Sequence, residues 1–244
     1  MIPTIPVSIA LAGLDAQSLG FAAQGRTPLP GSARGEEVRW LLTWAKSLGY
    51  RGVQLNATTP GIRPRDLDRS GRRDLAASIR RADLQCSGLD LWIPQEHFAD
   101  PANVDRAVSA TLSAIKLAAD LAALTSGSNV SSQPGNPGIV SVLLPQAVAS
   151  DVLSTIGNAA QTLGVWIADH CWPAREGGAT GEALRVGIDP AALLVAGQDP
   201  ARAVSQLGAR IASARLSDVA RGLAGVRVAP GSPQGTLDLL AYRV

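Results

Sequence analysis

The amino-acid sequence predicts an α/β protein in which parallel strands alternate with helices, and three observations support that fold class. First, apolar positions switch repeatedly between the two-residue period of strands and the three-to-four-residue spacing of helices. Second, Leu-Gly stands directly before a predicted strand at 48–49, 163–164 and 207–208, as expected for helices that end in a left-handed glycine. Third, no G-x-G-x-x-G follows the first strand, which favours a (β/α)8 TIM-type barrel over a dinucleotide-binding sheet.

Seven apolar segments are the predicted strands, and helical patterns separate most of them. The strands are residues 6–12, 53–57, 85–94, 140–145, 165–170, 186–189 and 211–218. Helices are predicted over 36–48, after a cap at Ser70, after the Asp100-Pro101 pair, around 148–163 and after the Asp199-Pro200 pair. A further helix begins after Thr236, and no eighth strand is visible. We therefore expect one domain over residues 1–244, a barrel that is incomplete at its eighth strand.

The charge balance is mild, with 22 Lys and Arg against 20 Asp and Glu and a net charge of +2. This balance argues against a nucleic-acid partner. No apolar run approaches the ~20 residues that span a bilayer, and the first residues lack the basic region of a signal peptide. We therefore expect a cytoplasmic protein without membrane contact. Cys86 and Cys171 stand far apart without zinc-finger spacing, so neither a disulfide framework nor a structural zinc is expected.

Candidate reactive groups are the polar residues at which the predicted strands stop, because reactive groups of a parallel barrel gather at the carboxyl ends of its strands. They are Gln54, Asn56, Asp90, Asp169, His170, Asp189, Arg215 and Asp218, followed in the loops by Glu96, His97, Trp92 and Trp172. We call the open end of the barrel, where the carboxyl ends of the strands meet, its mouth. Aspartates and a histidine at this mouth are suitable ligands for Mg²⁺, Mn²⁺ or Zn²⁺. Such a metal would polarise a sugar carbonyl or hydroxyl while a carboxylate moves the proton. The alternative is structural, since an aspartate at a strand end also caps the next helix.

Four segments, at 49–55, 165–170, 187–197 and 211–218, resemble the xylose-isomerase-like TIM barrels, a sugar phosphate isomerase/epimerase superfamily with an apurinic endonuclease branch. The resemblance implies a metal held by a Glu, an Asp, a His and a Glu that end strands five to eight. Asp169 stands where the first Glu is expected, and Asp189 matches the Asp. The histidine three residues after that Asp is replaced by Ala192, and the strand-seven histidine by Arg215, which we expect to pair with Asp189.

The leading hypothesis is a sugar or sugar-phosphate isomerase or epimerase that works by proton transfer assisted by a divalent metal. Its catalytic residues would be Asp169, Asp189 and His170, and the two aspartates would hold the metal. Its substrate contacts would be Asn56, Asp90, Trp92, Glu96, His97, Trp172 and Arg215.

Two alternatives remain open at the level of sequence. The replacements at Ala192 and Arg215 suggest a catalytically degenerate barrel that binds a sugar or a protein partner without turnover. An apurinic-endonuclease-like activity is the third reading, against which the balanced charge and the two histidines weigh. The free edges of an incomplete barrel also predict association into a homo-oligomer.

Overall fold

Seven parallel strands form one sheet in which each strand pairs with the next one along the chain. The computed structural model describes residues 8–12, 14, 19, 33–125, 137–176, 182–223 and 225–242. The strands are β1 (Ser8–Ala10), β2 (Gly52–Asn56), β3 (Gln85–Asp90), β4 (Gly138–Val142), β5 (Val165–Asp169), β6 (Leu184–Ile188) and β7 (Ile211–Ala214). All neighbouring pairs are parallel, so each connection must cross over the sheet.

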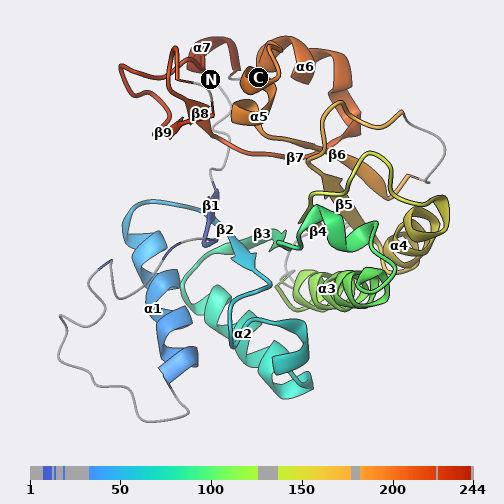
Figure 1. The fold of residues 1–244 in the computed structure, drawn as a ribbon. Coiled ribbons are helices and arrows are strands. Elements are labelled where there is room, and N and C mark those ends of the chain that lie inside the picture. The colour runs from blue at the N-terminus through green and yellow to red at the C-terminus, as the bar shows by residue number, and fades with distance from the viewer. Residues whose placement is uncertain are drawn as a thin grey trace.

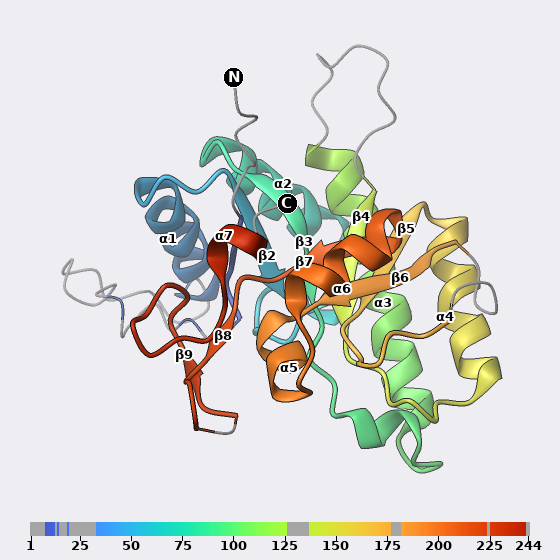
Figure 2. The same cartoon turned by 90° about the horizontal axis from the view of Figure 1, so that it is seen from above.

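The helices lie in the connections and cover the outside of this sheet (Figure 1). They are α1 (Ala33–Ser47), α2 (Arg69–Arg81), α3 (Val104–Thr125), α4 (Ser150–Thr162), α5 (Pro190–Val195) and α6 (Pro200–Leu207). After β7 the chain forms a short antiparallel pair, β8 (Asp218–Val219) with β9 (Arg227–Val228), and the helix α7 (Leu239–Tyr242). Seen from above, these last elements lie beside α5 and α6 (Figure 2).

The sheet is curled, because β7 approaches β4 and β5 as well as its hydrogen-bonded neighbour β6. Within the described residues β1 and β7 do not pair with each other. The strands therefore form the incomplete (β/α)8 barrel that the sequence predicts.

A continuous apolar core lies between the first five strands and the helices α1 to α4. Leu55 of β2, Ile79 of α2, Ile115 of α3 and Ile167 of β5 are each fully buried in it. Such near-complete burial is typical of parallel strands whose faces are both covered. A second, smaller cluster around Ile188 packs β6 against α5 and α6. The core thus fixes the positions of the strand ends at which the candidate site is expected.

Most predicted elements are confirmed, with differences at their ends. The three glycines that follow leucine have positive φ, with 88° at Gly49, 63° at Gly164 and 48° at Gly208, as the turn from helix into sheet requires. The helix α2 is capped by Asp68, whose carboxylate accepts from the Gly71 N–H, and not by the expected Ser70.

The helix α3 begins at Val104, later than predicted, because Asp100 forms a separate turn with the two residues that follow Pro101. By length and composition alone α3 is apolar enough to cross a membrane, although no such segment is predicted from the sequence. Its face with Ala114, Ile115 and Leu121 is buried in the core. This packing is that of the core helix of a globular domain.

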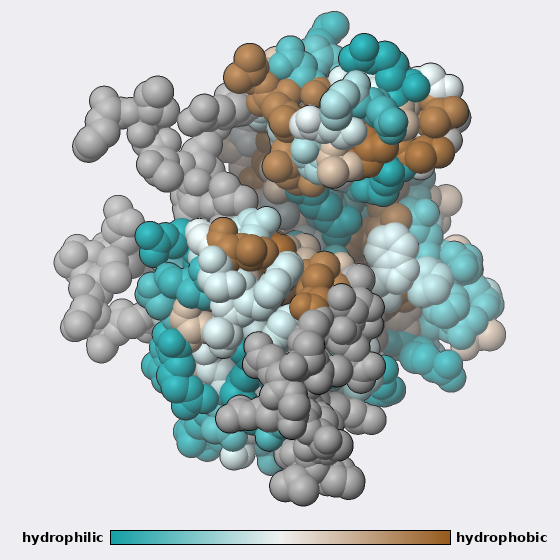
Figure 3. Space-filling view, turned by 90° about the vertical axis from the view of Figure 1, so that its left-hand side faces the viewer, coloured by the Kyte–Doolittle hydropathy of each residue, from teal (hydrophilic) through white to brown (hydrophobic). Residues whose placement is uncertain are grey.

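Apolar side chains also reach the surface over the C-terminal elements (Figure 3). Leu216, Leu223, Val226 and Leu240 are between 49% and 85% exposed. This surface and the unpaired edges of β1 and β7 are where the predicted association between copies would occur. The homo-oligomer itself stays a prediction.

Candidate functional site

Three predicted aspartates lie at the carboxyl ends of their strands and meet at one edge of the parallel sheet. Asp90 and Asp169 are the last residues of β3 and β5, and Asp189 directly follows β6. Their exposed fractions are only 8%, 5% and 8%. Each of the three carboxylates forms an ion pair with an arginine. We call these three ion pairs the Asp–Arg pairs; they determine the chemistry of this edge.

Asp169 is held by three donors. Its Oδ1 accepts from the backbone N–H groups of Leu144 and Cys171, both at 3.1 Å, and its Oδ2 accepts from Arg175 Nε at 2.9 Å. Arg175 also donates to the carbonyl of Leu144, which ties the loops after β4 and β5 together. Burial raises the pKa of Asp169, and these donors act in the opposite direction.

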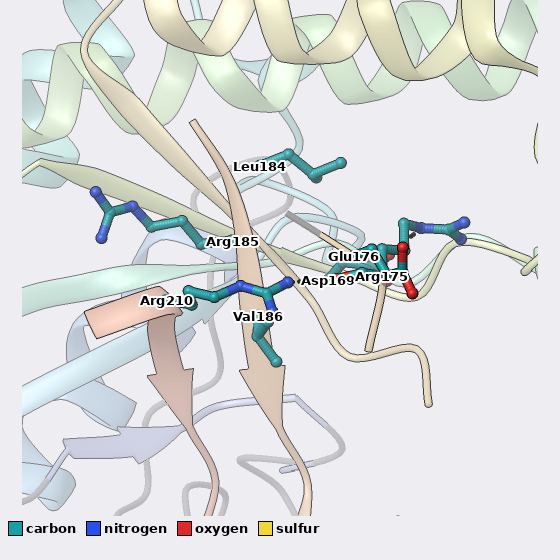
Figure 4. Close-up of a pocket in the computed structure, with 7 residues that line it drawn as sticks. All are labelled: Asp169, Arg175, Glu176, Leu184, Arg185, Val186 and Arg210. Atoms are coloured by element: carbon teal, nitrogen blue, oxygen red, sulfur yellow. Dashed lines mark hydrogen bonds and ion pairs between the residues drawn. The ribbon is translucent and has the colours of Figure 1, made fainter. Parts of the chain in front are cut away.

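The space beside Asp169 is small. Figure 4 shows Arg175 next to the Asp169 carboxylate and the side chain of Arg210 reaching toward them from the side of β7; Arg210 donates to the Arg175 carbonyl. The pocket that these residues line with β6 has a volume of about 20 Å³, which is room for one or two water molecules. A sugar does not fit there without movement of the arginines.

Asp189 has the capping role that the structural alternative predicts. Its Oδ1 accepts from the Ala191 N–H at 3.2 Å at the start of α5, and also from the Ser217 hydroxyl. Its Oδ2 accepts from Arg227 at 2.8 Å. Burial alone would raise the pKa of Asp189, but the hydrogen bonds from Arg227 and Ser217 and the nearby charge of Arg215 lower it. Asp189 is therefore a stable carboxylate at neutral pH.

Arg215 pairs with Asp90 at 2.7 Å and not with Asp189, so that part of the sequence prediction is wrong. The reason is that Arg227 of β9 already occupies Asp189. The Arg215–Asp90 bond joins the end of β7 to the end of β3 across the curled sheet, and Tyr242 of α7 donates to the Arg215 carbonyl at 3.0 Å. Burial raises the pKa of Asp90, and the Arg215 charge opposes this rise. The middle of the mouth is thus crossed by an ion pair.

The carboxylates of the Asp–Arg pairs do not fit as ligands of the divalent cation that the resemblance implies. Asp169 and Asp189 already hold a guanidinium as counter-ion and accept further N–H or O–H bonds. A metal ion would have to displace Arg175 or Arg227 and would be repelled by the positive charge of the other. Over the described ranges, no three His, Cys, Asp or Glu side chains gather in a group that could hold a metal ion.

His170 directly follows β5 and is 6% exposed, and within the described part of the chain neither ring nitrogen has a hydrogen-bond partner. Its imidazole lies against Gly187 of β6, where a Cβ atom would stand 2.5 Å from both Cδ2 and Nε2. Burial, followed by the charge of Arg215, lowers the pKa of His170 to about 3 against the opposing charge of Asp189. The imidazole is therefore neutral at pH 7, with one nitrogen able to donate and the other to accept.

The contact between His170 and Gly187 predicts a coupled pair of substitutions. Gly187→Ala should lower the free energy of unfolding by roughly 1–3 kcal/mol, because the new methyl group overlaps the imidazole. In a His170→Ala background the same substitution should cost much less. Urea unfolding of the two single variants and the double variant measures this coupling. An equal cost of Gly187→Ala in both backgrounds would show that the overlap is not with His170.

The remaining predicted substrate contacts form no bond to the Asp–Arg pairs in the described part of the chain. Asn56 Oδ1 accepts from the backbone and the hydroxyl of Thr58 and so shapes a turn. Trp92 is 62% exposed after β3, and Glu96 and His97 lie in the 3₁₀-helix η3 (Gln95–Phe98). Trp172 packs on the small apolar cluster beside β6.

Two of the arginines that neutralise the site, Arg175 and Arg227, were not predicted from the sequence. Arg175 lies in the loop after β5, six residues after Asp169, and Arg227 lies in β9, 38 residues after Asp189. Asp218 is also structural, since it accepts from the N–H groups of Thr236 and Leu237 and holds the segment before α7. The basic residues are nearly all arginine, with lysine only at 46 and 116, and this excess favours forked carboxylate contacts.

No protein-family model and no curated protein sequence matches this chain. Among solved structures, it is similar to a xylose isomerase domain protein from Planctomyces limnophilus, with a TM-score of 0.59 and 15% identity over 82% of this chain and 76% of the other. It is also similar to an L-ribulose 3-epimerase, with a TM-score of 0.52 and 16% identity over 72% of this chain. The match spans 62% of the epimerase. At these identities the likeness shows the fold alone, a TIM-type (β/α) barrel like those of the two structures.

Proposed function

Taking the xylose isomerase-like fold as the premise, we propose that this protein is a metal-independent barrel that binds a small sugar or sugar phosphate at the carboxyl edge of its strands. The observation that carries the proposal is the set of Asp–Arg pairs at the positions where the resemblance expects a metal site. Among the described residues, the three carboxylates of the Asp–Arg pairs are already neutralised and are not free to hold a cation. The site offers instead alternating acceptors and donors, the pattern that neighbouring sugar hydroxyls can match.

Two features of the mouth support a polar ligand with an apolar face. The Arg215 side chain is 25% exposed while it pairs with Asp90, so part of the guanidinium is open to a ligand. Trp92 follows β3 two residues after Asp90, and its ring is largely exposed. An exposed aromatic ring can stack on the C–H face of a sugar, because this contact removes the apolar surfaces of both from water. Binding would need no metal and would take place in the cytoplasm.

Proton-transfer isomerisation or epimerisation is the second candidate function. One specific observation favours it: burial raises the pKa values of Asp90 and Asp169, which favours the protonated form that a general acid needs. His170, next to Asp169, is neutral at pH 7, but its pKa of about 3 makes it a weak base. In this case the arginine partners would hold the carboxylates in place, and turnover would be slow without a metal to polarise the sugar carbonyl.

Thermal unfolding with sugars and metals separates these functions. We expect a panel of aldoses, ketoses and their phosphates to contain a ligand that raises Tm, equally with EDTA and with Mn²⁺, Mg²⁺ or Zn²⁺. Arg215→Gln should remove this rise. The matched control is Arg51→Gln, which makes the same charge change at the amino end of β2.

Each other outcome of this experiment has a definite meaning. Stabilisation by a metal alone that is lost in Asp189→Asn would overturn metal independence, and the lack of any stabilising sugar would overturn sugar binding. Deuterium uptake from D₂O into the bound sugar, followed by NMR, would show turnover and favour the isomerase or epimerase.

A further inference from the structure

A second cavity lies outside the barrel, between the loop after β2 and the helix α3. Its volume is about 500 Å³, which is within the range of small-molecule sites. Asp90 points into the barrel, where it meets Arg215. Leu91 is the next residue and continues the strand, since its N–H donates to the Ser141 carbonyl. Its side chain therefore points to the opposite face, toward α3, and helps to line the cavity.

The floor of this cavity is apolar. Ala57 and Leu91 are 3% and 5% exposed, and Ile93 and Ala110 are half-buried beside them. No acidic side chain lines the cavity among the described residues, whereas three arginines do. The site therefore combines an apolar floor with three positive charges.

The three arginines have free donors. Arg63 is fixed by its Nε, which donates to the Thr58 carbonyl at 2.7 Å, while its two terminal amino groups have no partner in the described residues. The nearest acid to Arg65 is Asp66, 3.8 Å away, and the Arg65 side chain is 77% exposed. Arg106, on the first turn of α3, has no hydrogen-bond or ion-pair partner in the part of the chain that the structure describes. In the Asp–Arg pairs of the mouth, by contrast, each arginine already has a carboxylate partner.

We propose that this cavity binds a small phosphate monoester whose organic part is apolar. Guanidinium groups match the oxygens of a phosphate through paired N–H donors, and the three positive charges are more than enough to neutralise its two negative charges. The apolar organic group would cover Ala57, Leu91 and Ala110 and exclude water from them. The site is separate from the mouth, because its lining side chains lie on the other face of the strands. It does not depend on the proposed sugar function.

The test is titration calorimetry of the full chain with phenyl phosphate, inorganic phosphate, phenol and benzoate. Phenyl phosphate should bind more tightly than any of the other three. Arg65→Gln and Arg106→Gln should each weaken its binding by about tenfold, as expected for the loss of one charge-assisted contact. Both residues are exposed, so neither change disturbs the core, and Arg106→Gln should leave any sugar-induced rise in Tm unchanged.

Arg80→Gln is the matched control, because Arg80 is an exposed arginine near the end of α2, away from the cavity. An equal loss of affinity in this variant would show general attraction of anions to the basic surface and would overturn the proposal. Phenol binding as tightly as phenyl phosphate would overturn the role of the arginines. Benzoate binding as tightly would overturn the assignment to phosphate, and inorganic phosphate binding as tightly would overturn the role of the apolar floor.

Discussion

Acidification from pH 6.5 toward pH 3 should destabilise the protein by up to ~5 kcal/mol through His170 alone, since its pKa is about 3 in the folded protein and 6.5 for an ordinary histidine. Between these two values the unfolded chain binds a proton that the folded protein does not. Proton binding therefore lowers the free energy of the unfolded state relative to the folded state as the pH falls, and stability is lost below about pH 6.5. The physical cause is the burial of the imidazole without a hydrogen-bond partner in the described residues, next to the positive charge of Arg215.

The measurement is urea unfolding at several pH values for the wild type and for His170→Phe, which keeps an aromatic ring but cannot titrate. The wild type should lose more stability than the variant over this range. The aspartates of the mouth also titrate, with a raised pKa at Asp90 and a lowered one at Asp189, but they are present in both proteins and cancel in the difference. His97→Gln is the control for loss of the other histidine. Parallel curves for wild type and His170→Phe would show that the imidazole is not buried in its neutral form.

The strands could be predicted because each one is encoded locally. Their apolar periods and the glycines at 49, 164 and 208 depend only on neighbouring residues, and the structure confirms them. Parallel order then places Asp90, Asp169 and Asp189 at one edge without further information. The helix α6 follows the same rule, since Asp199 caps it directly before Pro200.

The partners of the aspartates could not be predicted, because they depend on how distant loops fold back over the mouth. Arg227 reaches Asp189 only through the β8–β9 pair, which no period in the sequence indicates. Arg215 was expected to pair with the nearest aspartate in the strand order, but the curl of the sheet brings it to Asp90 on β3. The sequence thus predicts which residues line the site, whereas the tertiary fold determines which charges remain free.

The ion pair between Asp169 and Arg175 predicts a large loss of stability when Arg175 is replaced. Replacing it with Ala should lower the free energy of unfolding by about 3–5 kcal/mol, because the Asp169 side chain is only 6% exposed and would be left as a buried charge without a counter-ion. The same change in an Asp169→Asn background should cost much less, since the neutral amide needs no cation and its oxygen still accepts from Leu144 and Cys171.

Urea unfolding of the two single variants and the double variant at pH 7 gives the coupling free energy between the two side chains. Arg51→Ala is the matched control, because its contact with Asp83 is 3.9 Å long and both side chains are largely exposed, which predicts a loss below about 1 kcal/mol. Strong coupling between Asp169 and Arg175 would mean that their ion pair stabilises the fold, so a metal could bind Asp169 only after that pair is broken. The losses of stability in the single variants could instead add up to the loss in the double variant, with Mn²⁺ binding more tightly to Arg175→Ala than to wild type. This result would mean that Asp169 can bind a metal once Arg175 is absent.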